Sequence, residues 1–151
     1  MKTIRPTLAI LALAILASCE TTYRSSIPAA PVYIEINLDF EDADLLPIQA
    51  SKLFTRGQNI NLAVERAGYG GVLVYHALDN NYYAFDAACP NEADPSATVQ
   101  VDADRLHAVC RKCDSRYDLS YGNGNPVSGP SREQLKRYRA ALNGAKIIVG
   151  N

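Results

Sequence analysis

The sequence has no tryptophan, only two histidines among its 151 residues, and a formal net charge of -1. Two of its 15 basic residues, Lys2 and Arg5, precede all 16 acidic residues, so 13 basic side chains remain beyond residue 18 and that part is mildly acidic. A surface that follows nucleic-acid phosphates needs a basic excess, so no nucleic acid is expected as a partner. The absence of a phosphate-binding loop, a paired acid and base or a Ser-His-Asp set argues against an enzyme.

The first 18 residues have the order of an export signal peptide. Lys2 and Arg5 come first, an apolar run from Leu8 to Ala17 follows, and that run is too short for a membrane-spanning helix. The sequence Leu-Ala-Ser-Cys at 16–19 resembles the lipobox of bacterial lipoproteins. This resemblance implies cleavage before Cys19, lipidation of Cys19, and an exported protein anchored to the lipid bilayer of the cell envelope. The alternative is ordinary signal cleavage, with Cys19 an incidental thiol.

Residues 20–31 are rich in Ser, Thr, Ala and Pro and show no apolar period. This composition predicts a flexible tether, which together with the lipidated Cys19 forms a linker at 19–31 with a reach of at most about 40 Å. The remaining residues, 32–151, suffice for one small domain, and the 48% hydrophobic and 21% charged residues of the chain are typical of a globular protein.

Short strands separated by turn residues dominate residues 32–151. Alternating apolar residues from Val32 to Leu38 have the period of a strand with one buried face. Three hairpins are predicted, which pair residues 71–75 with 82–85, 98–101 with 106–109, and 138–142 with 147–149 around Asn143-Gly144. This pattern predicts an all-β, antiparallel domain. Residues 45–64 are expected to form a loop with one short strand or helical turn.

Residues 131–142 support two interpretations. Ser131 and Gln134 have the spacing of a capping box, so Leu135 to Leu142 can form a helix. The same residues can form the first strand of the last hairpin. Local propensity slightly favours the helix.

Once Cys19 carries lipid, three cysteines remain: Cys89, Cys110 and Cys113. A framework of disulfides alone needs an even number, so at least one sulfur is free, pairs with another chain or binds a ligand. The Cys-Arg-Lys-Cys sequence at 110–113 brings two sulfurs onto one tight turn, where they can share a metal ion or form an easily reduced disulfide. The basic residues of this turn either stabilise a thiolate or are simply solvated.

Three motifs resemble those of the Rieske iron-sulfur domain. They are Ala-Cys-Pro-Asn at 88–91, Val-Cys-Arg-Lys-Cys-Asp-Ser-Arg-Tyr-Asp-Leu at 109–119, and Val-Ser-Gly-Pro at 127–130. The family has Cys-x-His in its first loop, Cys-x-x-His-Gly-Ser-x-Tyr/Phe-Asp in its second, and a Gly-Pro loop that closes over the cluster. The resemblance implies a small antiparallel barrel or sandwich with an inserted cluster-loop subdomain, in which residues 135–142 form a strand.

The departures from the family lie at the metal ligands. In the family, two Cys bind one iron of a [2Fe-2S] cluster and two His bind the other. Cys89 and Cys110 stand at the Cys positions, whereas Asn91 and Cys113 stand at the His positions, so a conventional Rieske centre is excluded. The metal ligands that the resemblance implies are therefore Cys89, Cys110 and Cys113, with Asn91 as a weak fourth ligand that nearby Glu92 or Asp94 can replace.

The remaining family positions are partly kept. The resemblance implies that the hydroxyls of Ser115 and Tyr117 donate to sulfur and that Gly129-Pro130 closes over the site as part of the cofactor-binding surface. Ala93 and Asp114 stand where the family has glycine.

The two histidines are expected to be ordinary strand residues rather than metal ligands. His107 lies three residues before Cys110 on a predicted strand, so the two side chains point to opposite faces. His76 ends a strand well before the first cysteine loop.

Three functions are compatible with these features. The first is a one-electron transfer or redox-sensing module with a [2Fe-2S] cluster and a redox partner protein, whose potential is expected near the roughly -400 mV of plant-type ferredoxins. The second is a cluster-free Rieske scaffold with a Cys89–Cys110 disulfide, which serves as a structural or binding lipoprotein. The third is a zinc site made of the same sulfurs and one oxygen or nitrogen ligand.

Overall fold

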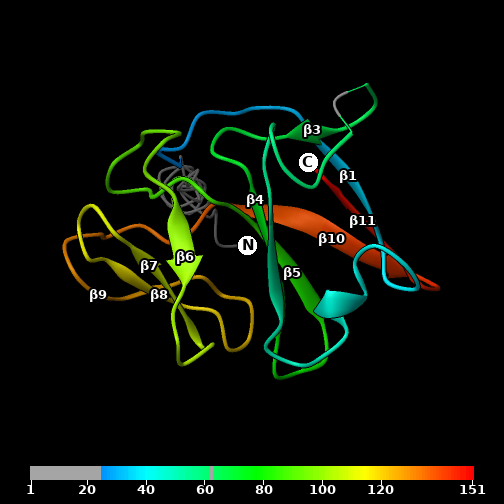
Figure 1. Ribbon diagram of the computed structural model, residues 1–151. Helices are drawn as coiled ribbons and strands as arrows, with labels where there is room; N and C mark the ends of the chain where they lie inside the picture. Colours follow the sequence, from blue (N-terminus) through cyan, green and yellow to red (C-terminus); the bar gives the residue numbers. More distant parts are fainter. Residues whose placement is uncertain (1–24, 62) are drawn as a thin grey trace, which may run out of the picture.

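The structure, a computed structural model, describes residues 25–61 and 63–151. Regular structure in this part is almost entirely β-strand, apart from one short 3₁₀ helix, η2 (Ala43–Leu45) (Figure 1). Over the same residues, no helix has the length and apolar character needed to cross a membrane. The all-β class expected from the alternating sequence pattern is confirmed.

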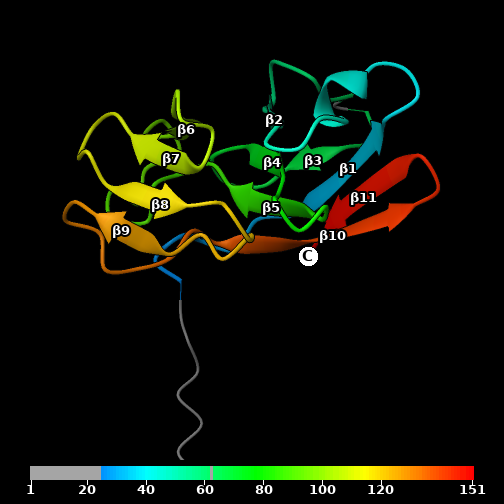
Figure 2. The ribbon, with the colours of Figure 1, turned by 90° about the horizontal axis from the view of Figure 1, so that it is seen from below.

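Eleven strands in the described residues form two antiparallel sheets. The larger sheet curls toward a barrel and contains, in spatial order, β2 (Ser51–Phe54), β4 (Val72–His76), β5 (Tyr82–Asp86), β10 (Arg137–Asn143), β11 (Lys146–Gly150), β1 (Val32–Asn37) and β3 (Arg66–Ala67). The smaller sheet contains β6 (Val99–Val101), β7 (His107–Cys110), β8 (Arg116–Asp118) and β9 (Pro126–Ser128). The chain forms the smaller sheet between β5 and β10, so this sheet is the inserted subdomain that was expected (Figure 2).

Two apolar cores hold the sheets together. Strand β1 buries alternate residues, including Ile34 and Ile36, in the core of the larger sheet. The second core joins the two sheets and contains Phe85 of β5 together with Cys89 and Cys110, both fully buried. Two of the site sulfurs are therefore embedded in apolar packing at the junction of the sheets.

The three predicted hairpins form. Strand β4 pairs with β5, and β6 pairs with β7, within one residue of the expected bounds. The last hairpin turns one residue later than predicted, because Asn143 pairs with Lys146 and leaves Gly144-Ala145 as the turn. Gly144 has a φ of 60°, which suits a tight hairpin that needs positive φ at its first turn position. The short strand expected within residues 45–64 is β2.

The helix considered for Leu135 to Leu142 is wrong, and the strand that the resemblance implied is present as β10. This strand pairs with β5 on one side and with β11 on the other. The Ser131 hydroxyl donates to the Glu133 carbonyl at 3.0 Å and so closes a local turn instead of capping a helix. Pairing on two edges outweighs a slight local preference for helix.

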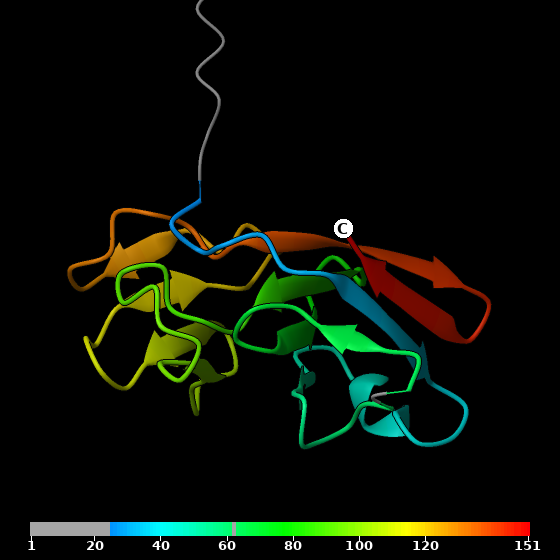
Figure 3. The same ribbon diagram turned by 90° about the horizontal axis from the view of Figure 1, so that it is seen from above.

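Residues 25–31, named here the N-terminal strap, lie on the domain although their composition predicted a tether as far as residue 31 (Figure 3). Ile27 is only 2% exposed. The Ser25 hydroxyl and the Ser26 amide each donate to Glu133 Oε1 at 2.8 Å. The Lys136 ammonium donates to the carbonyl of Pro28 at 2.8 Å. The packed part of the chain therefore begins no later than Ser25.

Candidate metal centre

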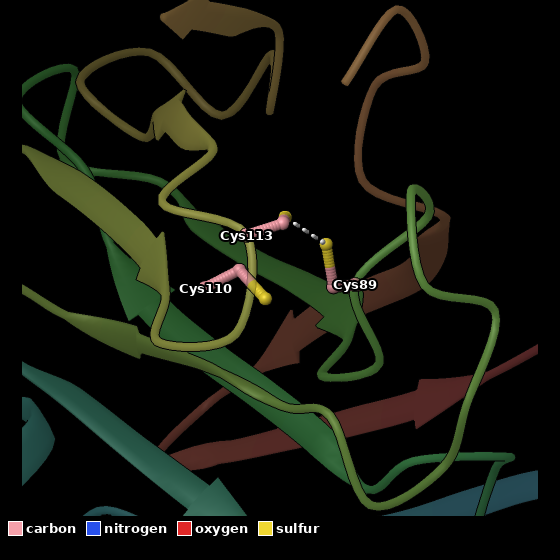
Figure 4. A group of neighbouring side chains, drawn as sticks. All are labelled: Cys89, Cys110 and Cys113. Carbon is pink, nitrogen blue, oxygen red and sulfur yellow. Dashed lines mark hydrogen bonds between the residues drawn. The ribbon is translucent and has the colours of Figure 1, made fainter. Parts of the chain in front are cut away.

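The three cysteines of the domain come from two neighbouring loops (Figure 4). Cys89 lies in the loop after β5, Cys110 ends β7, and Cys113 lies in the turn between β7 and β8. Their three Sγ atoms all lie within 4.8 Å of one another, and those of Cys89 and Cys113 are 3.7 Å apart. The fold thus brings together the three sulfurs that the sequence motifs singled out.

Backbone hydrogen bonds shape the first loop around Cys89. The amides of Glu92 and Ala93 both donate to the Cys89 carbonyl, at 3.1 and 2.9 Å. The Cys89 amide donates to the carbonyl of Ala97 at 2.9 Å, which closes the loop at its base. The position of the Cys89 sulfur is therefore set by main-chain geometry.

A buried carboxylate supports this loop from the strand before it. Asp86 is fully buried and accepts hydrogen bonds from the amides of Tyr69, Gly70 and Ala88 at 3.0, 3.0 and 2.9 Å, and from the Tyr138 hydroxyl at 2.5 Å. Burial and the hydrogen bond to Asp86 raise the pKa of Tyr138, so its hydroxyl stays a donor. Four donors compensate for the burial of the carboxylate. The sequence alone gives no sign of this role of Asp86, because a single Asp at a strand end forms no motif.

The second loop is a tight turn that a third segment closes. The Asp114 amide donates to the Cys110 carbonyl at 2.9 Å, and the Cys110 amide donates to the Ser115 carbonyl at 3.0 Å. Gly129 has a φ of 89°, and a Cβ atom there would lie 2.5 Å from the Ser115 Cα atom. Only glycine permits this approach of the third segment to the second loop. Pro130, the next residue, is exposed.

The two positions where the family has glycine keep a left-handed backbone in this chain. Ala93 has a φ of 49° and Asp114 a φ of 57°. Residues with a Cβ atom adopt this region at a cost of about 1–2 kcal/mol. Each cysteine loop therefore has one residue with a Cβ atom in a conformation that glycine adopts without strain.

Two buried hydroxyls lie beside the sulfurs. The Tyr117 hydroxyl is 3.2 Å from Cys89 Sγ, and the Ser115 hydroxyl is 3.2 Å from Cys113 Sγ. The Ser131 amide donates to Ser115 Oγ at 3.0 Å, and the Cys113 thiol donates to the same oxygen at 3.2 Å. Once Cys113 is a thiolate, the hydroxyl hydrogen of Ser115 can donate to the sulfur instead. Each of these two hydroxyls thus contacts one sulfur of the cluster.

The two sulfurs of the 3.7 Å pair differ in acidity. Burial raises the pKa of the Cys89 thiol to about 12, although hydrogen bonds from the Tyr117 hydroxyl and from the amides of Asn91 and Glu92 oppose this effect. Burial acts on Cys113 in the same direction, but hydrogen bonds with Ser115 outweigh it and lower the pKa of Cys113. Cys113 is therefore the first of this pair to become a thiolate, the form that binds metal.

The residues considered for a fourth ligand are held in a polar network at the edge of the site. Asn91 is exposed, and its side-chain amide donates to Glu92 Oε1 at 3.1 Å. The Lys112 ammonium lies 2.9 Å from Glu92 Oε2 and 3.6 Å from Asp94 Oδ2. Lys112 holds the pKa of Glu92 below its usual range, with smaller contributions from Asn91 and from the thiol of Cys113. The ion pair of Lys112 with Glu92 thus joins the two cysteine loops.

Both histidines have partners away from the sulfurs. His107 Nδ1 lies 2.7 Å from Asp104 Oδ2. His76 is buried, with Nδ1 3.2 and 3.1 Å from the carbonyl oxygens of Leu45 and Pro47. Neither ring belongs to the cysteine cluster, as the sequence predicted.

The chain matches no family model and no curated protein. Among solved structures, it is similar to the ferredoxin of carbazole 1,9a-dioxygenase from Nocardioides aromaticivorans IC177. The sequence identity is 20%, the match covers 80% of this chain and 95% of that chain, and the TM-score is 0.46. Both the sequence identity and the TM-score are too low to indicate a function. A function must therefore be inferred from the chemistry of the sulfur cluster.

The donor set of the cluster fits a thiophilic metal. Thiolates are soft ligands that favour iron-sulfur chemistry and zinc over the oxygen-loving cations. Cys89 and Cys110 are buried in apolar packing, whereas Cys113 is half-exposed and connects the site with solvent. Hydroxyl and backbone donors stand beside the sulfurs, as charged ligands require. The fourth ligand is the part of the site that the three cysteines do not supply.

Proposed function

We propose that Cys89, Cys110 and Cys113 bind iron and that this domain is a one-electron transfer module of the bacterial cell envelope. The convergence of three sulfurs within 4.8 Å is the observation that carries this proposal. Iron bound by thiolates supplies the redox chemistry, because it exchanges one electron between its ferric and ferrous states. The protein's own residues hold the sulfurs, exclude water from two of them and direct hydroxyls at two.

The arrangement suits electron transfer to another protein. Cys89 and Cys110 are fixed by the apolar core between the sheets, so a bound ion would move little between oxidation states. Cys113 is half-exposed and gives a redox partner protein a short path to the site. For a [2Fe-2S] cluster at this site, thiolate ligands in place of neutral imidazole would favour a potential nearer the roughly -400 mV of plant-type ferredoxins than the Rieske range, without a histidine-like dependence on pH.

Membrane anchoring is the second part of this proposal, and residues 1–24, which carry it, lie outside the described residues. The support comes from the order of basic, apolar and small residues before Cys19. Lipidation of Cys19 would confine the domain to a bilayer surface, where its redox partner would be a protein of the same membrane.

Anaerobic purification of the full-length protein in detergent tests the proposal. We expect bound iron, thiolate-to-iron charge-transfer absorbance, and reversible one-electron reduction at a low potential that changes little around neutral pH. Cys110→Ser should lose the iron, and His107→Ala, which changes a residue paired with Asp104 outside the cluster, should keep it. Failure to bind iron after anaerobic reconstitution contradicts the proposal.

The 3.7 Å separation of Cys89 and Cys113 favours a second candidate function, that of a metal-free binding or structural lipoprotein. Sulfurs this close can form a disulfide after a small side-chain rotation in an oxidising compartment. The sequence suggested Cys89–Cys110 for such a bridge, whereas the measured short contact joins Cys89 to Cys113. Thiol titration in denaturant separates the candidates: one free thiol per chain supports the disulfide, and three thiols released by an iron chelator support the metal centre.

A further inference from the structure

We infer that the three cysteines and Glu92 form a site for one tetrahedral metal ion, instead of the two-iron cluster that the Rieske motifs imply. This inference rests on the proposed function and deepens it, because it concerns the number of ions held at the same sulfurs. Its basis is the spacing of the sulfurs together with the environment of the positions that would ligate a second iron.

The sulfur spacing has the size of a single coordination shell. With metal-sulfur bonds of about 2.3 Å, two sulfurs on one tetrahedral ion lie about 3.8 Å apart. Cys89 Sγ and Cys113 Sγ are 3.7 Å apart, and no pair of the three sulfurs exceeds 4.8 Å. A shortening of at most about 1 Å in any pair therefore brings all three onto one ion.

A two-iron cluster needs a wider arrangement of ligands. The outer ligands of two irons joined by sulfides point away from each other, so at the same bond length ligands on different irons are separated by more than about 5 Å. In the Rieske pattern, Cys89 ligates the first iron and Cys113 replaces a ligand of the second. Their sulfurs nevertheless form the 3.7 Å pair, a spacing that fits two ligands of the same ion.

Asn91 stands at the other position that would ligate the second iron. Its side chain is exposed and donates to Glu92 at 3.1 Å, so it is not directed at a metal. The second iron of a Rieske-type arrangement would therefore have Cys113 as its one ligand from these two positions. The Cys113 sulfur, however, lies 3.7 Å from that of Cys89, which ligates the first iron in the Rieske pattern.

Glu92 is placed to complete the coordination shell. Its backbone amide donates to the Cys89 carbonyl at 3.1 Å, and its carboxylate pairs with Lys112 of the second cysteine loop, so Glu92 lies between the two loops that carry the sulfurs. The carboxylate is not among the ligand atoms that lie within 4.8 Å of one another, so it must turn from Lys112 toward the sulfurs to bind the ion. Three sulfurs and one carboxylate oxygen give the four ligands that a tetrahedral ion needs. Lys112, 2.9 Å from Glu92, supplies positive charge beside this anionic ligand set.

Cobalt(II) is a suitable probe, because tetrahedral thiolate sites give it intense visible bands. The full-length protein, reduced and metal-free in detergent, is titrated with cobalt(II) alone. We expect saturation at one cobalt per chain, with tetrahedral d–d bands and thiolate-to-cobalt charge transfer. Cys113→Ser should weaken binding by about 100-fold or more, since even outer-shell changes cost 10–100-fold. Glu92→Gln should weaken cobalt binding by about tenfold and keep the thiolate-to-cobalt bands, because all three cysteines remain. The control variant His107→Ala should bind cobalt as the wild type does.

Iron reconstitution with and without sulfide supplies the second readout. One iron per chain without acid-labile sulfide supports the single-ion site. Two irons and two sulfides per chain overturn it, yet leave electron transfer as the proposed function. Failure of the reduced protein to bind either metal overturns both, and unchanged cobalt affinity in Glu92→Gln overturns the assignment of the fourth ligand.

Discussion

Cys89 and Cys113 have unequal surroundings although their sulfurs nearly touch. Cys113 is half-exposed and lies beside the Ser115 hydroxyl, whereas Cys89 is fully buried beside the Tyr117 hydroxyl. The more accessible and more acidic thiol meets an incoming ion or oxidant first. Cys113 is therefore expected to bind an incoming ion first, and binding of that ion by the two buried sulfurs would then release their protons to solvent.

Alkylation by iodoacetamide measures this order in the reduced, metal-free protein. Because its pKa is lowered, Cys113 should be modified first, and its rate should rise at a lower pH than that of an ordinary cysteine. Cys89, whose pKa is raised to about 12, should react only after unfolding, since its thiolate is scarce throughout the neutral range. Peptide mass spectrometry over a time course at several pH values gives the order. Faster labelling of Cys89 than of Cys113 contradicts it.

The left-handed backbone at Ala93 predicts a gain in stability on substitution by glycine. Ala93→Gly removes strain of about 1–2 kcal/mol and adds about 0.5–1 kcal/mol of unfolded-state entropy, so the free energy of unfolding should rise by up to about 1.5 kcal/mol. Asp114→Gly is the matched variant, with a smaller gain because Asp tolerates this region better than Ala. Urea denaturation of the metal-free proteins measures both. A clear loss of stability in Ala93→Gly would show that this strain is absent.

The residues of the site differ in how far the sequence could predict them. Cys89, Cys110 and Cys113 could be identified because few residue types bind soft metals and their spacing is local. The role of Asp86 could not, since the donors that surround it come from segments that only the fold brings together. The ion pair of Glu92 with Lys112 depends in the same way on the meeting of two loops.

At the level of whole elements, the N-terminal strap joins the start of the domain to the first cysteine loop. The Ser26 hydroxyl donates to the Pro90 carbonyl at 2.8 Å, and Pro90 follows Cys89 directly. The strap has no regular secondary structure, so neither a period of two nor one of 3.6 could reveal it. Its attachment depends on one buried isoleucine and on hydrogen bonds to Glu133 and Lys136, which are distant in sequence.

Removal of the isoleucine side chain tests whether the strap is part of the folded unit. Ile27→Ala should lower the free energy of unfolding by about 2 kcal/mol or more, because it leaves a cavity in a site that is 2% exposed. It should also raise hydrogen exchange in residues 25–31. Val64→Ala, at a side chain that is 62% exposed, is the control and should change stability by less than about 0.5 kcal/mol. Unchanged exchange in Ile27→Ala would mean that the strap is held by its hydrogen bonds alone.

The local sequence pattern predicted most strands. Outside the three hairpins it did not predict which strands pair, and it did not decide between helix and strand for the segment that forms β10. The alternation in β1 and the turn residues of the hairpins depend on neighbours in sequence. Strand β10 has a local preference for helix and becomes a strand only because β5 and β11 offer edges on both sides. Its identity therefore depends on contacts between residues far apart in the chain, which the Rieske resemblance supplied and propensity did not.

At the scale of the whole molecule, the strap would shorten the connection between the proposed lipid anchor and the proposed metal site. If Cys19 is acylated, residues 20–24 alone separate it from the packed Ser25, a span of at most about 20 Å. This is about half the reach of the tether that composition predicted. Because the strap meets the domain beside Pro90, the end that carries the sulfurs is expected to stay near the bilayer.

Energy transfer in liposomes measures this distance. A donor dye on Cys113 of the lipidated, metal-free protein should transfer efficiently to acceptors in the lipid headgroups, since the anchor holds the cysteine loops near the surface. Insertion of a 20-residue Gly/Ser segment between residues 24 and 25 adds a root-mean-square length of about 25 Å and should lower the efficiency markedly. Cys19→Ala should abolish transfer by releasing the protein from the liposomes. Equal efficiency with and without the inserted segment would show that the strap does not govern how closely the sulfurs approach the membrane.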